Sequence, residues 1–254
     1  MKVTYTDTFY KEMENTNLAS ARAVVPLVMD LVHPHSIVDV GCGRGLWLKA
    51  FAEAGVTSIF GVDGVWVKPE DLVIPQGSFE SRDFESAFTV GRTADLVVSL
   101  EVAEHIEEKV ADAFVQALVA VAPVVLFSAA IPFQGGTSHV NEQWPAYWAA
   151  KFKAHGYVPV DAVRRHVWER DDVSFFYAQN ILIFVKESEL ATYPKLMLEI
   201  ERGYGVALSL VHPVLHTAVA ADGERWKLVV PYINKLPLGL LKNIKKTMQR
   251  LRNR

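Results

Sequence analysis

The sequence has one cysteine, Cys42, among 254 residues, and it has no long apolar run. A single cysteine excludes a disulfide within the chain and is typical of proteins from a reducing compartment. No stretch approaches the roughly 20 apolar residues that cross a bilayer. The first residues, Met-Lys-Val-Thr-Tyr-Thr-Asp, lack the apolar core of a signal peptide. We therefore expect a soluble, cytoplasmic protein.

Basic residues are scarce in most of the chain and gather at its end. Residues 1–189 contain 15 Lys/Arg and 25 Asp/Glu, whereas residues 190–254 contain 11 Lys/Arg and 4 Asp/Glu. An acidic body argues against a nucleic-acid partner. In residues 236–254, leucines alternate with lysines and arginines, so a helix there would be amphipathic and cationic. Such a helix could lie on the inner face of a membrane, or dock on its own domain or on a second copy in a homodimer.

Short β-branched runs alternate with helical patterns over the first 185 residues, which predicts an α/β fold with a mostly parallel sheet covered by helices. The predicted strands are residues 36–40, 58–63, 77–80, 94–100, 123–128, 157–160 and 174–185. The predicted helices are residues 18–32, 46–54, 144–155 and a stretch from the end of the fourth strand to about residue 121. Seven strands in this alternation predict a Rossmann-like, doubly wound sheet.

The alternation of strands and helices ends near residue 187. We expect a main domain at residues 1–186, in which residues 1–33 form an N-terminal helix or lid. Residues 187–254 are expected to form a basic, mainly helical extension.

A glycine-rich turn follows the first predicted strand. The run Gly41-Cys42-Gly43-Arg44-Gly45 comes directly after Asp39 and Val40, and glycine lets the backbone turn sharply and approach a ligand without a Cβ in the way. Asp63 ends the second predicted strand, where doubly wound nucleotide-binding folds place an acid that accepts hydrogen bonds from ribose hydroxyls. This register predicts a nucleotide site. A tight turn without a nucleotide is the alternative.

The spacing of the glycines bears on the kind of nucleotide. Dinucleotide sites usually show G-x-G-x-x-G, whereas residues 38–45 read Val-Asp-Val-Gly-Cys-Gly-Arg-Gly, which argues against an NAD-linked dehydrogenase. This run closely resembles motif I of the class I S-adenosylmethionine-dependent methyltransferases, and the resemblance extends from about Ser20 to Val185. It implies S-adenosylmethionine as the cofactor, with the glycine loop against its methionyl part and Asp63 on its ribose.

The same resemblance implies a set of cofactor-binding residues, in which an acid and its neighbour, Asp83 and Phe84, frame the adenine. An ordinary surface turn is the alternative for that pair. The implied residues are Asp39, Gly41, Cys42, Gly43, Gly45, Asp63, Asp83, Phe84, Ser99 and Leu100.

Acidic and histidine side chains gather after the fourth predicted strand, in Leu-Glu-Val-Ala-Glu-His at residues 100–105. If a helix starts there, Glu101, Glu104 and His105 lie at i, i+3 and i+4 and leave from one face. Converging carboxylates repel each other unless a cation lies between them. His139 follows the fifth strand and can reach the same edge of the sheet. We therefore predict a divalent cation, Mg²⁺ or Mn²⁺ first among several that suit oxygen and imidazole ligands, bound by Glu101, Glu104, His105 and His139.

The pattern E-x-x-E-H, with a histidine after the next strand, resembles the small-RNA 3′-terminal 2′-O-methyltransferases, in which these four positions bind a metal that grips both terminal ribose hydroxyls. Ubiquinone-type O-methyltransferases carry a similar E-V-x-E-H. Nothing else in the sequence resembles the RNA family, so only the four ligand positions transfer. The alternative is a wall facing the substrate without a metal, in which His105 or His139 is a general base.

A metal helps most where the acceptor is a poor nucleophile. An aliphatic hydroxyl is one, and a metal both lowers its pKa and fixes its position. Residues 138–148 mix amides, an acid and two tryptophans, as carbohydrate sites do, and they resemble bacterial methyltransferases encoded with polysaccharide assembly genes. Trp148 could equally pack its helix on the sheet.

We therefore expect O-methylation of a sugar or another diol in glycan or glycoconjugate synthesis, with catalytic roles for Glu104, His105 and His139. Two alternatives stay open. One is a metal-free methyltransferase of a small metabolite that uses a histidine base. The other is a non-catalytic subunit that binds S-adenosylmethionine within a glycan-assembly complex.

Overall fold

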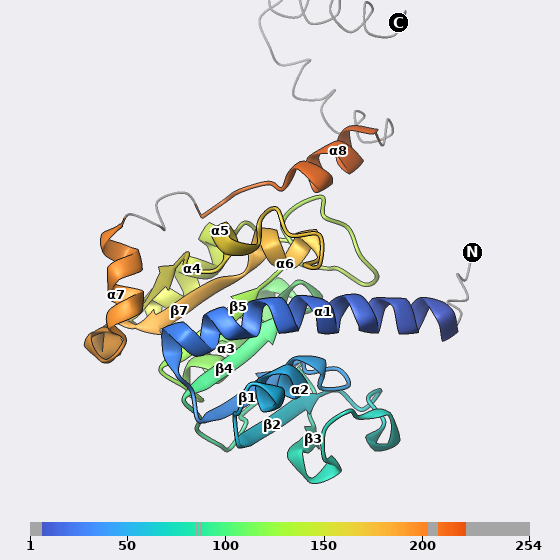
Figure 1. Ribbon diagram of the computed structural model, residues 1–254, viewed down its shortest axis with the longest axis horizontal. Coiled ribbons are helices and arrows are strands. Elements are labelled where there is room, and N and C mark those ends of the chain that lie inside the picture. Colours follow the sequence, from blue (N-terminus) through green and yellow to red (C-terminus); the bar gives the residue numbers. More distant parts are fainter. Residues whose placement is uncertain (1–6, 85, 87, 203–207, 222–254) are drawn as a thin grey trace, which may run out of the picture. The chain divides into compact units, whose positions relative to one another are not determined.

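The computed structural model describes residues 7–84, 86, 88–202 and 208–221 (Figure 1). Contacts divide the chain into two compact units, Met1–His212 and Pro213–Arg254. The described part of the second unit is the helix α8 (Pro213–Ala221). The cationic helix predicted at residues 236–254 lies outside the described residues.

A seven-stranded sheet forms the centre of the first unit. Its strands are β1 (Ser36–Val40), β2 (Ser58–Asp63), β3 (Phe79–Ser81), β4 (Leu96–Leu100), β5 (Val124–Ser128), β6 (Tyr157–Val160) and β7 (Leu182–Lys186). The spatial order is β3-β2-β1-β4-β5-β7-β6, and β7 is antiparallel to its neighbours β5 and β6 while the other pairs are parallel. The predicted Rossmann-like, mostly parallel sheet is confirmed.

Helices cover both faces of this sheet (Figure 1). One face packs against α1 (Asp7–Val32), α2 (Leu46–Glu53), α5 (Arg164–Val167), α6 (Phe175–Asn180) and α7 (Pro194–Glu201), and the other against α3 (Ala111–Val119) and α4 (Pro145–Ala154). Strand side chains alternate between faces, so Leu96 and Val98 face the first layer and Val97 faces the second. Among the described residues, none of the helices has the length and apolar character needed to cross a membrane.

Two predictions about these elements were wrong. The apolar run 174–185 is not one strand, because residues 175–180 form α6 and β7 begins only at Leu182. A short apolar run does not distinguish a helix from a buried strand by periodicity. The stretch after β4 does not start an α-helix either. It forms two short 3₁₀ turns, Ala103–His105 and Glu108–Val110, and α3 begins at Ala111.

The first compact unit extends past the boundary that the sequence predicted after residue 186. Leu196 of α7 is fully buried in the core shared with α1 and α2, and Glu199 forms an ion pair with Arg165. The short segment at residues 208–212 is tied to the same unit, because the backbone carbonyl of Leu208 accepts a hydrogen bond from Arg164 Nη1 at 2.7 Å. These contacts place the division after His212.

Candidate active site

The glycine turn after β1 adopts a backbone that other residues rarely reach. Gly41, Gly43 and Gly45 have φ of 85°, 52° and 87°, in the left-handed region. A Cβ on Gly41 would lie 2.2 Å from Val102 Cγ2, so that glycine allows close packing. A Cβ on Gly43 would meet no atom within 4 Å in the described part of the chain. Gly43 therefore faces open space, where a ligand can lie directly against the backbone.

Asp63, at the end of β2, is joined to this turn. Its Oδ2 accepts a hydrogen bond from the Gly43 amide at 2.6 Å, and its Oδ1 accepts one from the Gly64 amide at 2.6 Å. Burial raises the pKa of Asp63, and the two amides oppose that rise. The carboxylate thus fixes the glycine loop through Gly43, and the amide of the next residue, Gly64, satisfies its other oxygen.

A cavity of about 780 Å³ opens beside the turn. Its size is within the range of small-molecule and cofactor sites. Of the predicted cofactor residues, it is lined by Gly41, Gly43, Asp63, Asp83 and Phe84. A second cavity, of about 990 Å³, shares Asp83 with it but is lined by neither the glycine loop nor the histidines.

The other predicted cofactor residues lie behind the cavity wall. None of them is among its lining residues, and they are Asp39, Cys42, Gly45, Ser99 and Leu100. Burial, and then the charge of Asp63, raise the pKa of Asp39 well above its usual range. Gly45 packs closely on Ile74, where a Cβ would lie 2.9 Å from Ile74 Cγ1. Of these five residues, Gly45 is thus required by the packing of the turn, and none lines the cavity.

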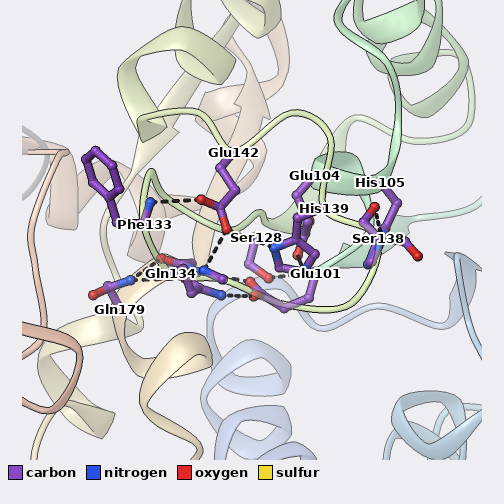
Figure 2. A network of polar contacts seen from close by, with 12 residues as sticks. Glu101, Glu104, His105, Ser128, Phe133, Gln134, Ser138, His139, Glu142 and Gln179 are labelled. Carbon is purple, nitrogen blue, oxygen red and sulfur yellow. Dashed lines mark hydrogen bonds and ion pairs between the residues drawn. The ribbon is translucent and has the colours of Figure 1, made fainter. Parts of the chain in front are cut away.

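Three of the four predicted metal ligands lie together beyond β4 (Figure 2). Glu104, His105 and His139 each offer one ligand atom, and these atoms lie within 4.8 Å of one another. The Glu104 side chain is 1% exposed, and neither of its carboxylate oxygens has a hydrogen-bond partner among the residues that the structure describes. Among the described residues, the nearest side-chain nitrogen of a basic residue is His139 Nε2, which lies 3.9 Å from Glu104 Oε1. Burial, and then the charge of Glu101, raise the pKa of Glu104 well above its usual range, and the backbone amides of Glu104 and Ala130, which lie near the carboxylate without reaching hydrogen-bond geometry, only partly oppose that rise.

Both imidazoles are oriented by acceptors on their Nδ1 atoms. His105 Nδ1 lies 3.2 Å from the Ser138 carbonyl oxygen, and His139 Nδ1 lies 3.0 Å from Glu142 Oε1. Because a carbonyl only accepts, the His105 proton is assigned to Nδ1, and Glu142 Oε1, which also accepts from the Gly135 amide, assigns the His139 proton in the same way. Each Nε2 then carries a free lone pair. Burial lowers the pKa of His105 more than the hydrogen bond to the Ser138 carbonyl raises it, which favours the neutral form that binds metals or accepts protons.

Glu142 holds the loop that carries His139, a role that the sequence did not reveal. Its carboxylate also accepts hydrogen bonds from the amides of Phe133 at 2.8 Å and Gly135 at 2.6 Å. The loop contains left-handed residues, among them Phe133 with φ 73° and Ser138 with φ 63°. The acid three residues after His139 was the signal that could have identified this role.

Glu101 departs from the predicted cluster. It leaves β4 with φ 55°, and its amide donates to the Ser128 carbonyl and hydroxyl oxygens at 3.1 and 3.0 Å. Its carboxylate accepts a hydrogen bond from Gln134 Nε2 at 2.7 Å (Figure 2) and another from Asn180 Nδ2 at 3.1 Å. The predicted helical face with Glu104 and His105 does not form, because the chain passes through a left-handed residue and a 3₁₀ turn. Glu101 lines the cavity but is not part of the Glu104–His105–His139 group.

Known proteins agree with this architecture. A family model described as a methyltransferase domain matches residues 12–171, more than half of the chain. No curated protein matches.

Solved structures share the fold at low identity. The sugar N-methyltransferase KedS8 from Streptoalloteichus sp ATCC 53650 is 15% identical, with a TM-score of 0.53 over 73% of this chain and 97% of that one. Magnesium protoporphyrin IX methyltransferase from Synechocystis PCC 6803, with bound SAH, is 19% identical, with a TM-score of 0.51 over 72% and 89%. The SAM-bound amino pentose methyltransferase CalS10 from Micromonospora echinaspora is 16% identical, with a TM-score of 0.50 over 73% and 99%. The chain belongs to the methyltransferase domain family and has the Rossmann-like fold of the class I S-adenosylmethionine-dependent methyltransferases.

Proposed function

We propose that this enzyme transfers the methyl group of S-adenosylmethionine to a hydroxyl of a sugar or another diol, assisted by a divalent cation, Mg²⁺ or Mn²⁺. Glu104, His105 and His139 would hold the cation. The observation that carries the proposal is the buried Glu104 carboxylate, whose two oxygens have no hydrogen-bond partner in the described part of the chain. A buried charge without a partner is costly, and a cation between this carboxylate and the two free Nε2 atoms would supply one.

The residues fit a cation in chemistry as well as in placement. One carboxylate and two neutral imidazoles suit Mn²⁺, Fe²⁺ or Zn²⁺, and open positions filled by hydroxyl oxygens also suit Mg²⁺. A carboxylate on the Nδ1 of a ligating histidine is a common supporting contact at metal sites, and Glu142 makes that contact with His139.

The division of labour follows from these positions. The glycine turn and Asp63 would hold the donor at one end of the cavity, while the histidine group lies at the end of β4 and in the loop after β5. Methyl transfer from a sulfonium is an in-line displacement, so the enzyme must chiefly align donor and acceptor. When bound, a cation would supply Lewis acidity that makes an acceptor hydroxyl more acidic. His105 and Ser138 line the cavity and would border the acceptor.

The charges of the cavity favour an acceptor without a free anionic group. Its ionisable lining residues other than His105 are four acids and one lysine, namely Asp63, Asp83, Glu101, Glu107 and Lys109. Lys109 is also paired with Glu107, at 2.6 Å. Two solved structures of the same fold are named as methyltransferases of a sugar and of an amino pentose. They are distant, and the first is named as an N-methyltransferase, so they support a sugar as the acceptor and not the choice of oxygen.

The test combines an acceptor screen with removal of metal. The full chain would be incubated with S-adenosylmethionine, Mn²⁺ and a panel of neutral sugars and amino sugars, and S-adenosylhomocysteine release measured. We expect release with a hydroxyl acceptor, loss of release in EDTA, and recovery on addition of Mn²⁺ or Mg²⁺. His139→Ala should lose both turnover and Mn²⁺ binding.

The alternatives give different results. Turnover that is indifferent to EDTA, with His139→Ala inactive, would replace the cation by a histidine base. S-adenosylmethionine binding without product from any acceptor would favour a non-catalytic subunit.

A further inference from the structure

Three amide side chains, those of Gln134, Gln179 and Asn180, form a hydrogen-bonded array with Glu101, and Gln134 is the half-buried one. Gln179 and Asn180, at the end of α6, are 0% and 2% exposed. Gln179 Nε2 donates to Asn180 Oδ1 at 2.9 Å and to Gln134 Oε1 at 3.3 Å. Asn180 Nδ2 also donates to Gln134 Oε1, at 2.9 Å. Gln134 and Asn180 then each donate to one oxygen of Glu101.

The backbone amide of His212 sets the direction of this array. It donates to Gln179 Oε1 at 2.8 Å. A side-chain amide alone leaves its two ends ambiguous, but a backbone N–H only donates, so the oxygen of Gln179 must face His212. Its NH₂ group then faces the oxygens of Asn180 and Gln134. Those two side chains must in turn direct their NH₂ groups at Glu101, which is held as a hydrogen-bond acceptor.

The segment that carries this amide is itself firmly attached. Besides the Arg164 bond to Leu208, the His212 ring lies with Nε2 2.8 Å from the Trp168 carbonyl oxygen and its centre 4.8 Å from the Trp168 ring. Arg164 is 1% exposed. Residues 208–212 lie beyond the stretch that the family model matches.

We propose that the array of Gln134, Gln179 and Asn180, anchored on the His212 amide, holds Glu101 outside the cation site as the carboxylate that binds the acceptor. This inference rests on the proposed function. The Glu101 carboxylate takes donors from Gln134, Asn180 and the Ser128 hydroxyl, which leaves one of its roughly four lone-pair sites, and the side chain lines the cavity beside His105. A hydroxyl of the acceptor can donate to it there. The left-handed backbone of Glu101, held by Ser128, is the kind of strain that functional sites retain.

The first arm of the test separates Glu101 from the cation ligands. Mn²⁺ dissociation constants would be measured by electron paramagnetic resonance for the full-length wild type, Glu101→Gln and Glu104→Gln. We expect a loss of at least about tenfold in affinity for Glu104→Gln and no more than about a twofold change for Glu101→Gln. Equal losses in both variants would overturn the proposal and leave the cation site standing. A wild type that binds no Mn²⁺ would instead end the proposed metal assistance.

The second arm measures the acceptor, with methyl β-D-ribofuranoside as a neutral cis-diol probe. Glu101→Gln should lower kcat/KM for the probe by at least about tenfold, with S-adenosylmethionine affinity unchanged. Wild-type kcat/KM in Glu101→Gln would overturn the proposal. If the wild type binds Mn²⁺ but does not turn the probe over, broadening of the probe's proton resonances by bound Mn²⁺ replaces turnover as the readout. The acceptor class of the proposed function would then be at fault.

A matched pair of variants tests the anchor. His212→Ala removes the ring and keeps the backbone N–H, whereas His212→Pro removes both. We expect kcat/KM for the probe to fall at least about tenfold further in His212→Pro than in His212→Ala, with unchanged Mn²⁺ and S-adenosylmethionine affinities. Glu101→Asp is the rescue variant, because it keeps a carboxylate at position 101 and Glu101→Gln does not. Equal kinetics in the two His212 variants, with equal melting temperatures, would show that the N–H does not position Glu101.

Discussion

Two buried carboxylates belong to the candidate site, Asp63 lining the cavity and Glu104 outside its lining, and they differ in how the protein satisfies their oxygens. Asp63, on the cofactor side, has both oxygens hydrogen-bonded by backbone amides of its own chain. Glu104, on the acceptor side, has neither oxygen bonded within the part of the chain that the structure describes. Burial raises the pKa of both groups. The oxygens of Asp63 are therefore satisfied by the fold itself, and the side chain fixes the glycine loop. The oxygens of Glu104 are satisfied only by a bound partner or a proton.

The largest effect is expected from a change in the glycine turn on the cofactor side. Gly43→Val would put a branched side chain into the open space beside the loop, at φ 52°. We expect S-adenosylmethionine binding to fall below detection by calorimetry. Left-handed backbone alone costs about 1–2 kcal/mol of stability, so a control with the same strain is needed.

Gly91→Val is that control. Gly91 has φ 68° and does not line the cofactor cavity. The Gly91→Val variant should be less stable than the wild type and should bind S-adenosylmethionine with the same affinity. If Gly43→Val bound S-adenosylmethionine with wild-type affinity, the assignment of the cofactor to this loop would be wrong.

The two sides also differ in how much of each could be predicted from the sequence. The glycine turn and Asp63 were predictable because their contacts are local in the sheet: Gly41 accepts no side chain, and β1 and β2 are adjacent and parallel. The strand pattern predicted their register, since β-branched runs ended at the turn and at the acid.

The acceptor side depends on contacts between distant segments. His105 and His139 could be paired from the order of the strands, but the placement of Glu101 could not. Its amide bonds to Ser128 of the neighbouring strand, which requires a left-handed residue where the local pattern favoured a helix. Gln179 and Asn180 interrupt an apolar run, and buried amides require partners. That signal was present, but the sequence does not show that the partners are Gln134 and the His212 amide.

An effect of intermediate size is expected from a change at Glu142, which positions His139. Glu142→Ala would release His139 Nδ1 and the amides of Phe133 and Gly135. We expect Mn²⁺ affinity to fall about 10–100-fold, with S-adenosylmethionine affinity unchanged. Glu142→Gln keeps one acceptor oxygen for His139 and Gly135 and should lose less. If Glu142→Ala bound Mn²⁺ with wild-type affinity, Glu142 would not be needed to position the cation ligands.

A smaller effect is expected from Asp63→Asn. The amide keeps one acceptor oxygen for the loop and presents an NH₂ group to the other donor, so one of the two backbone bonds is lost. We expect S-adenosylmethionine affinity to fall by about 1 kcal/mol, roughly fivefold, as measured by calorimetry. Mn²⁺ affinity should not change, because Asp63 is not part of the Glu104 group. A change in turnover alone, at constant cofactor affinity, would contradict the role of Asp63 on the cofactor side.

The smallest effect should come from truncation after His212. Every residue assigned here to the cofactor or the acceptor side lies in the first compact unit, Met1–His212. Removing residues 213–254 should therefore change S-adenosylmethionine and Mn²⁺ affinities by less than about twofold, within 0.4 kcal/mol. Truncation after residue 202 also removes the His212 amide and the Leu208 carbonyl, which bond to Gln179 and Arg164. That shorter chain should keep cofactor affinity, since neither residue lines the cofactor cavity, and should lose kcat/KM for the diol probe as His212→Pro does. Loss of cofactor binding on truncation after His212 would show that the second unit supports the cofactor side.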